Sequence, residues 1–127
     1  MESLATTIRF VTLNCRTLSS ELQQATLSRL LRYLCVSFAA LQETRMRDRP
    51  VTSIENYTIY YSDAEENKLG GCAIAVRNDY KNLVDEFGST SSRCAFLLRD
   101  RRGRKLWIIS AHAPTETAEN NSKDDLL

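Results

Sequence analysis

Residues 7–41 read TIRFVTLNCRTLSSELQQATLSRLLRYLCVSFAAL and carry the pattern of a strand, a helix and a second strand. The first part, Thr7 to Cys15, is short and rich in β-branched and aromatic residues, which predicts a strand largely buried on both faces. Val36 to Leu41 predicts a second strand, parallel to the first, since the helix between them is the usual crossover of a right-handed strand–helix–strand unit. This unit indicates an α/β (α+β) fold with a mixed sheet and one long helix near the N-terminus.

The predicted helix begins after Ser19 or Ser20, because a serine hydroxyl can accept a hydrogen bond from the free amides of a first helical turn. It is expected to end near Tyr33. Its apolar residues recur at helical spacing and are Leu22, Ala25, Leu27, Leu30, Leu31 and Leu34.

Four further strands are predicted downstream. Tyr57 to Tyr61 and Gly71 to Val76 form a pair joined by the polar residues 63–69. Cys94 to Arg99 and Leu106 to Ala111 form another pair around Gly103, where glycine can adopt the positive φ of a tight turn. Pro114 ends the last strand, and residues 116–127 are polar and acidic, which predicts a tail or the beginning of a truncated helix.

The chain has 127 residues, 43% of them hydrophobic, which fits one globular domain and excludes a disordered or collagen-like protein. No apolar run is long enough to span a bilayer and no signal peptide is evident, so we expect an intracellular protein that is not secreted, in the nucleus or the cytoplasm. The cysteines are too widely spaced for a zinc motif, and free thiols are expected at Cys15, Cys35, Cys72 and Cys94.

The formal net charge is +1, but the cations are clustered. One cluster is Arg45, Arg47 and Arg49, and the other is Arg99, Arg101, Arg102, Arg104 and Lys105. Such clusters suit a phosphate backbone, although a charged loop is also typical of ordinary solvated surface.

Three predicted strands end in a polar residue that packing does not require: Asn14, Glu43 and His112. Ligands bind beyond the carboxyl ends of strands in open α/β sheets, so these groups converge on one site if the strands are parallel neighbours. A carboxylate and an amide are oxygen ligands that suit Mg²⁺, with substrate phosphate and water completing the shell. A histidine beside them could contact a phosphate oxygen or donate a proton.

Each residue also has a purely structural interpretation. Glu43 can be the first solvated residue after a strand, and His112 can be a satisfied strand-end histidine. Asn14 can be a turn former that bonds its own backbone.

Five segments in order resemble the endonuclease/exonuclease/phosphatase superfamily. They are Leu13–Leu18 (LNCRTL), Leu41–Arg45 (LQETR), Asn56–Tyr61 (NYTIYY), Gly70–Val76 (GGCAIAV) and Ser110–Thr115 (SAHAPT). The likeness spans Ile8 to Thr115 and is closest to the apurinic-type endonuclease domains of non-LTR retrotransposons and their craniofacial-development-protein-like relatives. It implies the N-terminal half of the four-layer α/β-β/α sandwich of the deoxyribonuclease-like fold, with residues 1–115 as a truncated domain and 116–127 as its tail.

The resemblance implies roles for five residues. Glu43 would bind the catalytic Mg²⁺, for which Mn²⁺ can substitute, and Asn14 would help to organise metal and phosphate. His112, where pancreatic-type deoxyribonucleases also have a histidine and apurinic-type members a tyrosine, would contact phosphate or donate a proton. Arg16 and Arg45 would lie beside the nucleic-acid backbone.

The family's later D-x-N motif and its terminal Ser-Asp-His, which supplies the general base, do not occur in this sequence. We therefore expect a fragment of a retrotransposon-derived, metal-dependent hydrolase that cleaves DNA phosphodiester bonds, with little or no activity alone. The alternative is a non-catalytic nucleic-acid- or protein-binding half-domain that uses the arginine clusters.

Half of such a sandwich would lack the second sheet and leave an apolar face open, through which the chain could self-associate. A nucleotide-binding domain is disfavoured, because neither G-x-G-x-x-G nor a P-loop follows the first strand.

Overall fold

The structure is a computed structural model that describes residues 8–46, 51–62, 70–90, 93–99 and 102–111. Several predicted features lie outside these ranges: Arg47, Arg49, Arg101, His112, Pro114, the connection 63–69 and the tail 116–127. Within them the fold is mixed α/β, mostly sheet, with one main helix.

The predicted strand–helix–strand unit is present. It consists of β1 (Phe10–Asn14), α1 (Glu21–Tyr33) and β2 (Phe38–Gln42). The two strands are parallel, in a register that runs from Phe10 opposite Phe38 to Asn14 opposite Gln42.

Helix α1 begins directly after Ser20, one of the two predicted caps, and ends at Tyr33 as predicted. Ser20 is its N-cap: Ser20 Oγ accepts from the backbone N–H of Gln23 at 3.1 Å, and Gln23 Oε1 accepts from the N–H of Ser20 at 3.0 Å. This reciprocal pair is a capping box, which satisfies amides that the helix itself cannot. The chain leaves α1 through Leu34 and through Cys35, which has a φ of +57°.

A five-stranded sheet contains β1 and β2 together with β3 (Val51–Ile54), β4 (Tyr57–Tyr61) and β5 (Cys72–Arg77), in the order β1-β2-β5-β4-β3. The predicted antiparallel pair is β4 and β5, whereas β3 was not predicted. The expectation that the first strand is buried on both faces is wrong, because β1 is at the edge of this sheet and its side chains alternate between half-buried and exposed.

A second sheet follows a 3-10 helix, η2 (Asn78–Leu83). Its strands are β6 (Val84–Thr90), β7 (Arg93–Arg99) and β8 (Lys105–Ala111), antiparallel in that order. The hairpin between β7 and β8 was predicted, with Gly103 at a φ of +78° in its turn. The expectation that the chain lacks a second sheet is wrong, because β6, which the sequence did not reveal, completes a three-stranded one.

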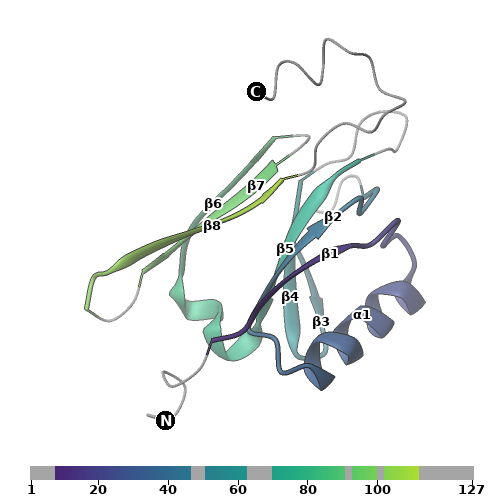
Figure 1. Ribbon diagram of the computed structural model, residues 1–127, viewed down its shortest axis with the longest axis horizontal. Helices are drawn as coiled ribbons and strands as arrows, with labels where there is room; N and C mark the ends of the chain where they lie inside the picture. The colour runs from purple at the N-terminus through teal and green to yellow at the C-terminus, as the bar shows by residue number, and fades with distance from the viewer. Residues whose placement is uncertain (1–7, 47–50, 63–69, 91–92, 100–101, 112–127) are drawn as a thin grey trace.

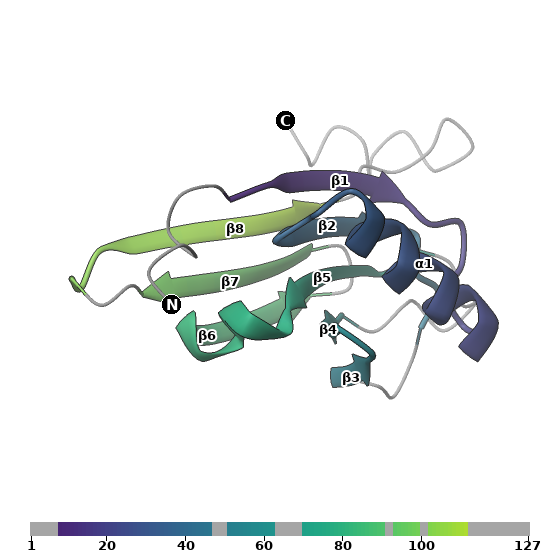
Figure 2. The same ribbon diagram turned by 90° about the horizontal axis from the view of Figure 1, so that it is seen from below.

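The described elements form three layers: α1, the five-stranded sheet and the three-stranded sheet (Figures 1 and 2). One cluster of buried residues fills the space between α1 and the five-stranded sheet and includes Leu27, Leu31 and Leu41. Another joins the two sheets and includes Phe38, Ile74 and Phe96. The core therefore has two parts, one on each face of the central sheet.

An apolar surface remains open on β8, where the side chains of Trp107 and Ile109 are 55% and 60% exposed. Among the described helices, none has the length and apolar character needed to cross a membrane.

Candidate functional site

The carboxyl ends of β1 and β2 lie side by side, since the strands are parallel and neighbouring. Asn14 pairs in register with Gln42, and the backbone N–H of Cys15 donates to the carbonyl of Gln42 at 2.8 Å. Glu43 is the next residue after Gln42. The structure thus brings the segments of Asn14 and Glu43 to the same end of the five-stranded sheet, where β1 and β2 terminate.

The C-terminal end of β8, in the second sheet, contacts the C-terminal end of β2. Ser110 Oγ donates to the carbonyl of Leu41 at 2.9 Å, and Gln42 Nε2 donates to Ser110 Oγ at 3.2 Å. The same Nε2 donates to Thr12 Oγ1 of β1 at 3.1 Å. His112 comes two residues after Ser110, outside the described residues, so the structure places the strand that precedes it but not the histidine.

The segments that follow β1 and β2 have an unusual backbone. Arg16, Glu43 and Arg45 have φ values of +56°, +55° and +55°, and Thr17 has +143°. Residues other than glycine rarely adopt such φ values, because each costs about 1–3 kcal/mol. Residues with this backbone strain cluster at functional sites. Four of the six such residues in the described chain lie in these two short segments.

Backbone hydrogen bonds hold this strained backbone in place. The N–H of Arg45 donates to Gly70 at 2.9 Å, the N–H of Thr44 donates to Gly71 at 3.2 Å, and the N–H of Leu18 donates to the carbonyl of Thr44 at 2.9 Å. The Gly70–Gly71 segment before β5 therefore supports the loop that presents Glu43. Its two glycines have positive φ, which explains why the sequence has glycine there.

Asn14 forms the local bond that its structural interpretation requires. Its Oδ1 accepts from the backbone N–H of Arg16 at 3.1 Å, which stabilises the turn after β1. An amide oxygen has two lone pairs, so this bond leaves acceptor capacity on the exposed Asn14 side chain. The turn therefore orients the Asn14 amide and leaves its oxygen able to accept a second interaction.

Two buried polar atoms beside Glu43 have no hydrogen-bond partner within the described part of the chain: Thr44 Oγ1 and Arg45 Nε. Thr44 is fully buried and Arg45 is half-buried. Buried polar groups are nearly always paired, so these two atoms, beside the strained backbone of Glu43, are positions that a water molecule or a ligand could satisfy.

The donor set fits a magnesium ion bound largely by water and phosphate. Glu43 would supply one carboxylate and Asn14 one amide oxygen, and Mg²⁺ in proteins typically takes only one or two carboxylates. Within the described ranges, no group of three or more His, Cys, Asp or Glu side chains gathers that could hold a metal ion.

Cys15 lies next to this site but is unsuited to act as a nucleophile. Burial raises the pKa of its thiol to about 11, so the thiol is protonated at neutral pH. Thiolates, not thiols, attack substrates.

The sequence did not indicate the side chains that join the ends of β1, β2 and β8, which are Thr12, Gln42 and Ser110. Gln42 and Ser110 belong to the LQETR and SAHAPT segments, yet no local pattern indicates that residues so far apart in the chain are hydrogen-bonded. A scan against models of protein families found no match, and a search of curated proteins found none either.

Proposed function

We propose that this chain carries the metal- and phosphate-binding part of a divalent-metal-dependent phosphodiesterase of the endonuclease/exonuclease/phosphatase type, and that its substrate is DNA. The observation that carries the proposal is the position of Asn14 and Glu43 at the adjacent carboxyl ends of two parallel strands, with Glu43 on strained backbone beside unpaired buried polar atoms of the described residues. The layer order of helix, sheet and sheet supports the deoxyribonuclease-like sandwich as the parent fold.

In this proposal each residue has a defined task. Glu43 holds Mg²⁺ or Mn²⁺, which when bound neutralises the charge that grows on the phosphoryl oxygens during attack by water. Asn14 orients a phosphate oxygen with its amide, and Arg16 and Arg45 lie beside the backbone of the substrate. His112 contacts the phosphate or protonates the leaving oxygen.

Catalysis by this chain is expected to be slow. The sequence contains one histidine, which cannot both contact the phosphate and activate the attacking water. A missing general base costs about 10²–10⁴ in rate.

The test is nicking of supercoiled plasmid in Mg²⁺ or Mn²⁺, together with calorimetric titration of Mn²⁺ into the protein. The Glu43→Gln variant should lose both nicking and metal binding, because an amide is a far weaker ligand than a carboxylate. The matched control is Glu86→Gln, which neutralises an exposed acid on β6 and should leave both unchanged. Nicking that persists in EDTA or in Glu43→Gln would contradict the proposal.

A further inference from the structure

Two fully buried cysteines, Cys72 and Cys94, lie in different sheets. Cys72 is the first residue of β5 in the five-stranded sheet, and Cys94 is in β7 of the second sheet. Neither has any exposed surface, and both belong to the cluster of buried residues that joins the two sheets. Neither has a task in the proposed phosphodiesterase.

The register of the strands brings the two cysteines face to face. Within the five-stranded sheet, Cys72 is directly opposite Gln42. Within the second sheet, Cys94 is directly opposite Ser110. Since the side chains of Gln42 and Ser110 are hydrogen-bonded at 3.2 Å, these two cross-strand pairs lie one above the other. Cys72 and Cys94 therefore occupy facing positions between the sheets.

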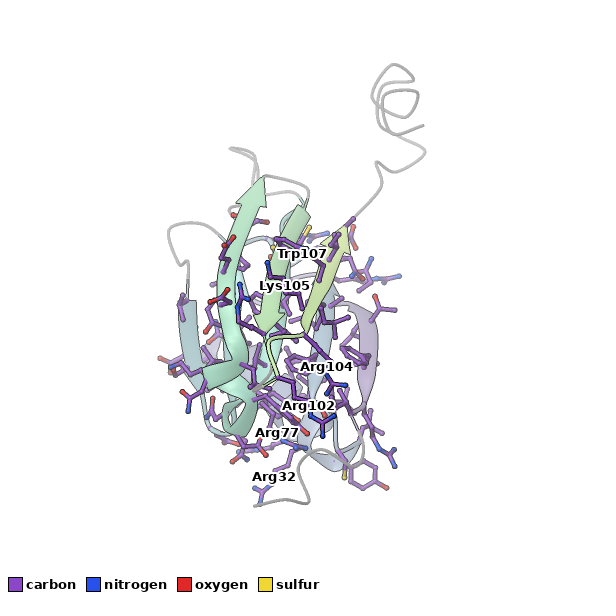
Figure 3. All side chains as sticks on the ribbon, turned by 90° about the vertical axis from the view of Figure 1, so that its left-hand side faces the viewer. Arg32, Arg77, Arg102, Arg104, Lys105 and Trp107 are labelled. Carbon is purple, nitrogen blue, oxygen red and sulfur yellow. The ribbon has the colours of Figure 1, made fainter. Side chains whose placement is uncertain are left out.

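The alternation of side chains along β8 gives the same result. Figure 3 looks onto the outer face of the second sheet, where Trp107 lies with its side chain 55% exposed. Ser110 is three positions further along the strand, so it is on the inner face, where it is buried and bonds to β2. Directly opposite residues of an antiparallel pair share a face, so Cys94 also points toward the first sheet.

The two thiols form a side-chain hydrogen bond with each other. This bond from the Cys94 thiol lowers the pKa of the Cys72 thiol, because it stabilises the ionised Cys72 sulfur. The same bond, together with burial, raises the pKa of the Cys94 thiol. Cys72 is therefore the member of the pair that ionises first.

The cysteine pair is close to the loop that carries Glu43. The carbonyls of Gly70 and Gly71, directly before Cys72, accept backbone hydrogen bonds from that loop. Ser62 Oγ accepts from the backbone N–H of Cys72 at 2.9 Å, which fixes the start of β5. Cys72 and Cys94 thus face each other where β5, the second sheet and the Glu43 loop meet.

We propose that Cys72 and Cys94 are a site of reversible oxidation, at which a small disulfide such as glutathione disulfide converts the two thiols into a disulfide bond between the sheets. Such a bond requires two cysteines whose side chains point toward each other across a short gap, and hydrogen-bonded thiols on facing strands meet this requirement. The site does not depend on the proposed phosphodiesterase function, because its chemistry uses neither metal nor nucleic acid.

The reaction consists of two thiol–disulfide exchanges. The Cys72 thiolate attacks one sulfur of glutathione disulfide, which forms a mixed disulfide and releases one glutathione thiolate. Cys94 then loses its proton and attacks the Cys72 sulfur, which releases the second glutathione thiolate. The protein thiols give up two electrons and two protons, and one glutathione disulfide becomes two glutathione thiols.

Burial makes this exchange slow in both directions. Because both sulfurs are fully buried, the second sheet must open from the first before glutathione can reach Cys72. Once the bond has formed and the sheets have closed, the same burial protects it from reductants. The test therefore measures an equilibrium and not a rate.

The test uses a variant with Cys15→Ala and Cys35→Ala, which leaves Cys72 and Cys94 as the only cysteines of the chain. It is equilibrated with mixtures of reduced and oxidised glutathione, starting from both the reduced and the oxidised protein, in native buffer and in concentrated urea. The fraction of disulfide gives the effective concentration of one thiol at the other. This concentration should be about 30-fold or more higher in the folded chain, because a disulfide that fits a fold stabilises it by at least this factor. A value no higher in native buffer than in urea would overturn the inference.

Peptide mapping of the parent protein, with all four cysteines, identifies the bond. Trypsin cleaves after Lys68, Arg77, Arg93 and Arg99, so the disulfide joins a peptide of residues 69–77 to one of residues 94–99. The joined pair is two hydrogen atoms lighter than the sum of the peptides, and a reductant separates it. Glutathione bound to Cys72 or Cys94 at equilibrium, or a bond from either to Cys15 or Cys35, would contradict the proposal.

Single variants connect the bond to the stability of the fold. Oxidation should raise the Tm of the parent by about 10 °C. Cys94→Ala should abolish this rise, whereas Cys35→Ala, at an exposed cysteine, should keep it in full. Equal loss of the rise in both variants would assign it to another bond and would refute the inference. Glu43→Gln should oxidise as the parent does, so failure of the phosphodiesterase proposal and failure of this one are distinguishable.

Discussion

Gln42 Nε2 donates a hydrogen bond of 3.2 Å to Ser110 Oγ across 68 positions of sequence. Ser110 is buried, and its hydroxyl in turn donates to the carbonyl of Leu41 at 2.9 Å. This contact joins the end of β8 to the end of β2, immediately before Glu43. It is the link through which the second sheet reaches the candidate site.

Ser110→Ala should destabilise the protein by about 1–3 kcal/mol, because Gln42 Nε2 and the carbonyl of Leu41 both lose a buried partner. Urea unfolding followed by circular dichroism measures the change. Ser89→Ala, at an exposed serine of β6, is the matched control and should stay within about 0.5 kcal/mol of the parent. Equal effects of the two substitutions would show that the Ser110 contact is not made.

Glu43→Gly should be more stable than Glu43→Ala by about 1 kcal/mol, although both lack the carboxylate. The reason is the φ of +55° at this position, which alanine adopts at a cost and glycine does not. The same pair of substitutions at Ser53, an exposed residue of β3, should give the opposite order, because glycine weakens a regular strand. Thermal unfolding of the four variants gives both differences.

Tyr57→Phe should cost about 1–2 kcal/mol. The Tyr57 hydroxyl is buried and donates to the carbonyl of Val36 at 2.6 Å, which ties β4 to the segment between α1 and β2. The substitution leaves that carbonyl without its donor. Tyr33→Phe, at an exposed ring of α1, should change the free energy of unfolding by less than about 0.5 kcal/mol.

Cys15 should make the protein less stable at alkaline pH. Burial raises the pKa of its thiol from 9.0 to about 11. Between about pH 9 and pH 11 the unfolded chain loses this proton while the folded chain keeps it, so the contribution of Cys15 is complete below pH 9 and is lost as pH rises through 11.

Urea unfolding at pH 8 and at pH 10.5 measures this loss. The loss should be smaller in Cys15→Ala, which has no thiol to ionise there.

Alkylation by iodoacetamide near neutral pH should modify the exposed Cys35 before the partly buried Cys15. The opposite order of modification would contradict the burial of Cys15.

Local pattern was sufficient to predict α1, its cap at Ser19 or Ser20 and the hairpin turn at Gly103. These features depend on residues within a few positions of one another, such as the hydroxyl of Ser20 and the amide of Gln23. Helical spacing and turn chemistry are therefore readable from a short window of sequence.

Strand β6 and the edge position of β1 could not be predicted in the same way. Residues 84–90, VDEFGST, have weak strand character, and their pairing with β7 supplies what their propensity does not. The order of strands in a sheet depends on contacts between distant segments, and that order places β1 at the edge.

The candidate site also has features that local sequence predicts and features that depend on contacts between distant segments. The amino-acid sequence by itself determined that polar residues follow the strands, with Asn14 and Glu43 at two strand ends. Only the tertiary structure decided that these ends are neighbours, that Ser110 holds β8 against them, and that Cys72 and Cys94 face each other between the two sheets. The physical reason is that chain connectivity specifies strand ends one at a time, whereas sheet pairing and burial bring distant residues together.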